Sequence, residues 1–187
     1  YAQYILAVTL SAGATGALVA SVSPPRIHPF TLEIERDVYP VEAIAFMRDH
    51  RLTGKTITFF DWGQQVLWEL PNNPVSFDGR LDTVYPPSVM EAHWRFYRGE
   101  NPGPGFDPAQ AEVALLPTGS GATTRLLGMG WIEVYQDPLA SVLVKNRAQF
   151  AGLANLSLPF RRGLDAVRGR EPFPAALPAL AAPHAPR

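Results

Sequence analysis

The segment at residues 55–86 constrains the fold most, because it combines a strand, a tight turn, a helix and a second strand in quick succession. Residues 56–60 are β-branched or aromatic, which is typical of a buried strand. The helix that follows opens at Gly63 and ends before a Pro-Asn-Asn-Pro turn, and residues 75–77 then predict a second short strand. This unit indicates an α/β sheet with helices packed beside it.

The segments on either side of this unit continue the alternation of helices and strands. Pro40 precedes an amphipathic helical pattern, and the late part of the chain ends in two strand patterns joined by a turn. Together they predict an α/β domain with a small mixed sheet of about 4–5 strands, flanking helices and a closing antiparallel hairpin. Helices are predicted at residues 41–52, 87–99 and 122–130, and strands at residues 30–35, 111–117, 131–135 and 141–144.

The first part of the chain reads as a membrane span. Residues 1–25 carry no charged side chain, and a helix over residues 4–22 would extend roughly 28 Å, close to the thickness of a bilayer core. Gly13 and Gly16 belong to a small-residue face that suits helix contact in lipid. The alternatives are a signal peptide, although the basic start that it needs is not visible, and a buried globular helix. We expect one transmembrane helix at residues 1–25, followed by the α/β domain at residues 26–150.

The last part of the chain, residues 151–187, is rich in Pro, Ala and Arg and has no helix or strand period. Ordering such a segment costs about 1–2 kcal/mol per residue, so it needs a surface to lie on, either its own domain or a partner. Its apolar side chains, separated by arginines and prolines, suit an extended arm on a neighbouring subunit. We predict that partner contacts come from the span and this tail, at Gly13, Gly16, Phe160, Arg161, Arg162, Leu164, Arg168 and Phe173.

Composition argues against several functions. The formal net charge of −1 gives no general affinity for nucleic acid. The absence of cysteine removes disulfides, thiolate metal sites and cysteine nucleophiles. The histidines show neither paired metal-ligand spacing nor a Ser–His–Asp pattern, and we therefore expect no catalytic residue, no metal and no cofactor. They stand at His28, His50, His93 and His184.

Three local features leave a choice between a ligand-binding and a structural role. Asp61, Asp78 and Asp82 could bind a hard cation or sugar hydroxyls, but we favour a helix cap at Asp61 and an ion-paired tip formed with Arg80. The Gly-Ser-Gly at residues 119–121 could cradle a phosphate, but it lacks the lysine of known phosphate loops, and we favour a helix start. The tryptophans could stack on a sugar, but core or interface anchors are commoner; they are Trp62, Trp68, Trp94 and Trp131.

The central motifs also carry a resemblance to a known family. An Asp-Trp-Gly triplet is followed by Asp-Gly-Arg, and a strand AEVALLP is followed by the hairpin VYQDPLASVLVKN. With these motifs, residues 39–147 resemble the extracytoplasmic C-terminal domain of polytopic bacterial membrane proteins similar to C-type membrane glycosyltransferases. The resemblance implies an α/β fold outside the cytoplasm; in such enzymes the catalytic acid lies between early spans, so their activity does not transfer to this segment. The motif residues are Asp61, Trp62, Gly63, Asp78, Gly79, Arg80 and Asp82.

Two functions of different classes follow. The one we favour is a non-catalytic, membrane-anchored accessory subunit of the bacterial inner membrane with its domain on the periplasmic side. Its partners would be the lipid bilayer and other membrane protein subunits, such as those of a respiratory or photosynthetic assembly. The alternative is the C-terminal soluble domain of a polytopic glycosyltransferase-like enzyme that helps to bind a lipid-linked sugar. A purified polypeptide near 20.5 kDa would favour the first, and a much larger one the second.

Overall fold

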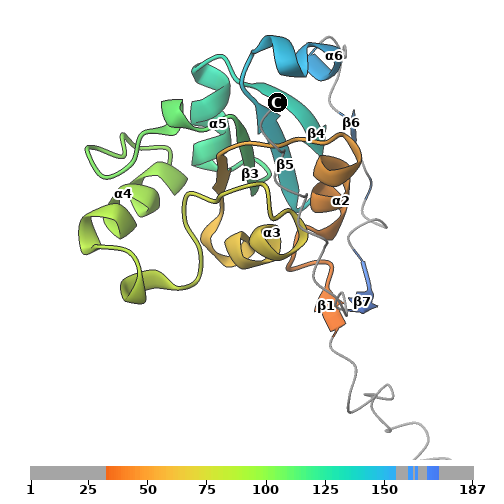
Figure 1. The fold of residues 1–187 in the computed structure, drawn as a ribbon, viewed down its shortest axis with the longest axis horizontal. Coiled ribbons are helices and arrows are strands. Elements are labelled where there is room, and N and C mark those ends of the chain that lie inside the picture. Colours follow the sequence, from red (N-terminus) through yellow and green to blue (C-terminus); the bar gives the residue numbers. More distant parts are fainter. Residues whose placement is uncertain (1–32, 155–159, 162, 164–167, 173–187) are drawn as a thin grey trace, which may run out of the picture. The chain divides into compact units, whose positions relative to one another are not determined.

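A computed structural model describes residues 33–154, 160–161, 163 and 168–172. This part of the chain is α/β, with a mixed sheet and flanking helices, as predicted (Figure 1). The predicted transmembrane helix lies outside the described residues. Among the helices that are described, none is both long and apolar enough to cross a bilayer.

The main sheet has the order β2-β3-β5-β4-β6. β2 and β3 are parallel, β3 and β5 are antiparallel, and β4 and β5 form the predicted closing hairpin. A short parallel pairing then adds β6 at the edge of β4. The strands are β2 (Thr56–Thr58), β3 (Val113–Pro117), β4 (Ile132–Gln136), β5 (Ala140–Val144) and β6 (Phe160–Arg161).

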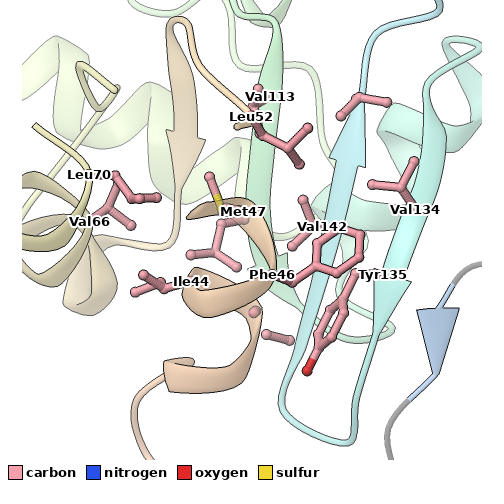
Figure 2. Close-up of a cluster of buried hydrophobic side chains, with 14 of the residues drawn as sticks. Ile44, Phe46, Met47, Leu52, Val66, Leu70, Val113, Val134, Tyr135 and Val142 are labelled. Carbon is pink, nitrogen blue, oxygen red and sulfur yellow. The ribbon is translucent and has the colours of Figure 1, made fainter. Parts of the chain in front are cut away.

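Helices cover both faces of this sheet. Successive side chains of β3 point to opposite faces, and each set packs against a different pair of helices. Val113 and Leu115 join the cluster that holds α2 and α3, whereas Ala114 and Leu116 join the cluster that holds α4 and α5. Figure 2 shows the first cluster, where the side chains of α2 pack against those of β4 and β5. The helices are α2 (Val41–Asp49), α3 (Gly63–Glu69), α4 (Pro87–Tyr97), α5 (Gly121–Gly128) and α6 (Ala151–Ala154).

The prediction of a strand at residues 75–77 was wrong. Val75 forms only an isolated parallel bridge with Thr56. Pro74 has no N–H that could donate to a strand ladder. After the bridge, hydroxyl groups form the hydrogen bonds that backbone groups would form in a ladder. The Ser76 hydroxyl accepts from Thr58 N, and the Thr58 hydroxyl donates to Phe77 O.

Two parts of the C-terminal segment pair with the domain itself. Besides β6, residues of β7 (Arg170–Pro172) form an antiparallel ribbon with β1 (Glu33–Glu35). Arg170 strengthens this ribbon, since its guanidinium lies 3.6 Å from a Glu33 oxygen and 3.3 Å from a Glu35 oxygen. The tail was predicted to lie on its own domain or on a partner. Its strands β6 and β7 lie on its own domain.

Candidate functional site

The Asp-Gly-Arg motif folds into a tip organised by one buried carboxylate. Asp78 is fully buried, and its Oδ1 accepts hydrogen bonds from the backbone N of Arg80 at 3.0 Å and from its Nε at 2.9 Å. Its Oδ2 accepts from an Arg80 terminal nitrogen at 2.6 Å and from the Tyr85 hydroxyl at 3.0 Å. The hydrogen-bonded Arg80 side chain holds the pKa of Asp78 below its usual value, although burial acts in the opposite direction.

The Asp-Trp-Gly motif packs directly against this tip. A Cβ added to Gly63, the first residue of α3, would lie 2.4 Å from Phe77 O and 2.8 Å from Asp78 Cβ. Gly79 likewise lies against the Gln64 side chain. Trp62 is buried, and its indole Nε1 donates to Val38 O at 3.0 Å. Two of the motifs on which the predicted resemblance rests, Asp-Trp-Gly and Asp-Gly-Arg, are thus parts of one packing unit.

The predicted roles of the other two acids, Asp61 and Asp82, were wrong. Asp82 is exposed and forms no ion pair within the described part of the chain, so the ion-paired tip consists of Asp78 and Arg80 alone. Asp61 does not cap α3, because it lies inside the 3₁₀ turn Phe60–Trp62 and no side chain caps either helix start. Burial raises the pKa of the Asp61 carboxyl. Among the described residues, no group of three or more His, Asp or Glu is placed to hold a metal.

The Gly-Ser-Gly turn is a helix start, as we favoured. Ser120 is the N-cap of α5, and its hydroxyl accepts from Thr123 N at 3.2 Å. A Cβ on Gly121 would lie 2.5 Å from the carbonyl of Arg98. The turn is therefore packed against the end of α4. The Ser120 hydroxyl serves the backbone N–H of its own helix.

The tryptophans divide between core and surface. Trp62 and Trp131 belong to the core, and Trp94 packs edge to face on Phe60 with ring centroids 4.9 Å apart. Trp68 is half-buried and lines a cleft together with Tyr39. This distribution confirms the core role for two of the four.

We call this hollow the Trp68 cleft; it has a volume of about 360 Å³ and includes Glu33, Asp61 and Gln64. Gln65 lines it as well and is only 7% exposed. The Gln65 Nε2 donates to Glu69 at 2.7 Å, whereas its buried Oε1 has no hydrogen-bond partner in the described part of the chain. Aromatic faces beside carboxylates and amides are a chemistry that can bind polyhydroxylated ligands.

Sequence reasoning missed the glutamines of this cleft. The signal was present, because Asp61, Gln64, Gln65 and Trp68 recur at spacings of three and four residues, which place side chains on one side of a helix. Tyr39 and Glu33 come from a distant segment, so no local pattern could have linked them to α3.

The predicted partner-binding residues fall largely outside this description. Phe160 and Arg161 form β6, and Arg168 is exposed. The predictions for Gly13, Gly16, Arg162, Leu164 and Phe173 concern residues that the structure does not describe.

No family model, curated protein or solved structure matches this chain. The resemblance to the C-terminal domain of C-type glycosyltransferase-like proteins therefore stays a prediction. The class that the geometry itself defines is an α/β domain whose motif residues are engaged in packing.

Proposed function

We propose that this protein is a non-catalytic accessory subunit of a larger membrane protein complex in the bacterial inner membrane, with its α/β domain on the periplasmic side. The observation that carries this proposal is the state of Asp78. Both of its oxygens already accept hydrogen bonds from Arg80 and Tyr85, so the most buried acid of the motif region is used to fix the tip. A carboxylate engaged in this way serves architecture better than proton transfer.

The pairing of β1 with β7 supports the proposal, because it brings together the segments next to the two predicted attachment regions. β1 follows the predicted span in sequence, and β7 belongs to the predicted docking tail. Their pairing ties the chain that leaves the membrane to the chain that would reach a neighbouring subunit. The partner in this proposal is a larger membrane assembly, such as a respiratory or photosynthetic complex.

The test is co-purification from the native membrane. Deleting residues 156–187, and separately Gly16→Leu, should each lower the amount of chain recovered with its host complex, because one removes the arm and the other the small-residue helix face. Asp82→Asn is the matched control, since this exposed side chain makes no ion pair in the described part of the chain. Recovery of both variants at full stoichiometry, or extraction of the wild type by alkaline carbonate without detergent, would contradict the proposal.

A second candidate function is favoured by the Trp68 cleft. In this alternative the domain is the C-terminal part of a polytopic glycosyltransferase-like enzyme and helps to bind a lipid-linked sugar. The unsatisfied Gln65 Oε1 could accept from a sugar hydroxyl, while Tyr39 or Trp68 packs on the ring.

Two measurements separate these candidates. The first is the mass of the native polypeptide that contains this sequence, because a value far above 20.5 kDa favours the enzyme. The second is binding of a short-chain polyprenyl phosphate hexose, which Gln65→Met should weaken about tenfold if the amide contacts the sugar. Gln110→Met is the control, since Gln110 is exposed and lies outside the cleft. Equal binding by both variants would remove the cleft from consideration.

A further inference from the structure

A second cavity lies next to α4, whose Val89 and His93 line it. It has a volume of about 480 Å³, within the range of small-molecule sites, and we call it the His93 cavity. Its walls come from the start of β2, the bridge segment at residues 74–76, the first turns of α4 and the loop at residues 104–111. Val75, Val89 and Phe106 provide apolar surface, and Lys55 and Asp107 provide charge.

His93 is the feature of this cavity that requires explanation. Its side chain is 1% exposed and stacks on Phe77, with ring centroids 4.6 Å apart and an interplanar angle of 21°. Phe106 lies on it as well, with a centroid distance of 4.2 Å. Burial lowers the pKa of this imidazole, which therefore stays neutral at physiological pH.

The hydrogen bond of His93 assigns its tautomer. Nδ1 lies 2.9 Å from Val89 O, a carbonyl that can only accept, so Nδ1 carries the proton. Nε2 is then a hydrogen-bond acceptor, and it is buried without a partner among the residues that the structure describes. Buried polar atoms are almost always satisfied, so this nitrogen calls for a donor that enters the cavity.

The surroundings of His93 restrict the chemistry of such a donor. Phe106, Val75 and Val89 favour a flat, apolar body. Lys55 is exposed and forms no ion pair in the described part of the chain, so its ammonium group can donate to an anionic ligand. Asp107, the other charged wall residue, already uses Oδ1 to accept from Ala109 N.

We propose that the His93 cavity binds a small aromatic acid whose ring O–H or N–H group donates to Nε2 of His93 and whose carboxylate lies at Lys55. The aromatic body packs against Phe106 and Val89. This inference does not depend on the membrane role proposed above, because it rests on residues of the α/β domain alone.

The test compares three probes on the full chain by titration calorimetry: 3-(4-hydroxyphenyl)propionate, 3-phenylpropionate and tyramine. The first should bind saturably. The second lacks the ring donor and should bind about tenfold more weakly, because a buried acceptor would then remain unpaired. Tyramine lacks the carboxylate and carries a positive charge, so it should bind more weakly still next to Lys55.

Variants then assign the contacts. His93→Phe keeps a flat ring between its neighbours and should abolish the preference for the hydroxylated probe, and Lys55→Gln should weaken both acids. His50→Phe is the matched control, since the His50 Nδ1 also lies near the carbonyl of the residue four positions earlier, at 3.0 Å, and its ring also stacks on a phenylalanine. That histidine is exposed and lies outside this cavity.

The wild-type comparison decides the outcome even if His93→Phe does not fold. Tighter binding of the hydroxylated acid, with a shift of the His93 Nε2 resonance in ¹⁵N NMR, supports the proposal. Equal binding of the two acids, or no saturable binding of any probe, would overturn it and indicate that a buried water alone satisfies Nε2.

Discussion

At the scale of single residues, Asp78 connects two parts of the chain that sequence alone leaves separate. Its carboxylate holds Arg80 and Tyr85, while the preceding carbonyl, Phe77 O, accepts from the hydroxyl of Thr58 in β2 at 2.9 Å. The tip is therefore tied to the sheet on one side and closed on itself on the other. Because the carboxylate is buried and charged, removing its charge leaves hydrogen-bond donors without a full partner.

Asp78→Asn should lower the free energy of unfolding by about 2 kcal/mol, less than for a fully buried pair because the Arg80 side chain is 52% exposed. Urea denaturation monitored by tryptophan fluorescence measures this. Asp82→Asn, an acid of the same tip that is exposed, should change the free energy by no more than about 0.5 kcal/mol. Equal effects of the two changes would mean that the tip is solvated rather than packed.

The same carboxylate predicts a pH dependence. Arg80 lowers the pKa of Asp78 in the folded state, so its contribution is fully present above the unfolded-state value of about 3.9 and is lost as pH falls through the folded-state value. The stability difference between wild type and Asp78→Asn should be constant from about pH 5 to 7 and shrink below about pH 4. Denaturation midpoints measured across this range check it; a difference that grows on acidification would contradict the assignment.

At the scale of elements, α3 can reach its position only because its first residue has no side chain. Gly63→Ala would place a Cβ 2.4 Å from a backbone oxygen, which cannot move aside as a flexible side chain can. We expect a loss of about 3 kcal/mol. Thermal unfolding followed by circular dichroism measures it.

Gly128→Ala provides the control for that change. Gly128 ends α5, is exposed and has no atom within 4 Å of an added Cβ. Alanine should therefore stabilise the protein by about 0.5 kcal/mol through its helix propensity. If both alanine variants behaved alike, the close approach of α3 to the tip would not be the cause.

At the scale of the whole molecule, two described strands of the C-terminal segment pair with strands of the domain. β6 pairs with β4 through Tyr135 and Gln136, and β7 pairs with β1. The buried clusters draw on residues 43–150. Leu153 of α6 packs against the first of these clusters, whereas β6 and β7 contribute strand pairing.

Deleting residues 156–187 should leave one cooperative unfolding transition. It should speed amide hydrogen exchange at the edge of β4 and in β1, because each loses its neighbouring strand. Hydrogen exchange followed by mass spectrometry measures both segments, with β3 in the middle of the sheet as the internal control. Loss of the cooperative transition would show that the tail is part of the folding unit.

Sequence patterns determined the local elements of this domain. The apolar run at residues 111–117 predicted β3, the helical spacing after residue 87 predicted α4, and the turn at residues 136–139 predicted the β4–β5 hairpin. These signals are local, since they depend on periodicity and on the turn preferences of Gly and Pro. Ser120 and the glycines beside it also predicted the start of α5 from sequence alone.

Only the tertiary structure decided which residues meet. The hydroxyls of Thr58 and Ser76 took the place of a backbone ladder, so residues 75–77 formed a single bridge, and Asp61 became a cleft residue instead of a cap. The burial of the His93 ring, which leaves its Nε2 unsatisfied among the described residues, involves Phe77 and Phe106 from other segments of the chain. Burial and partner choice are long-range properties, because they depend on segments whose approach no local period encodes.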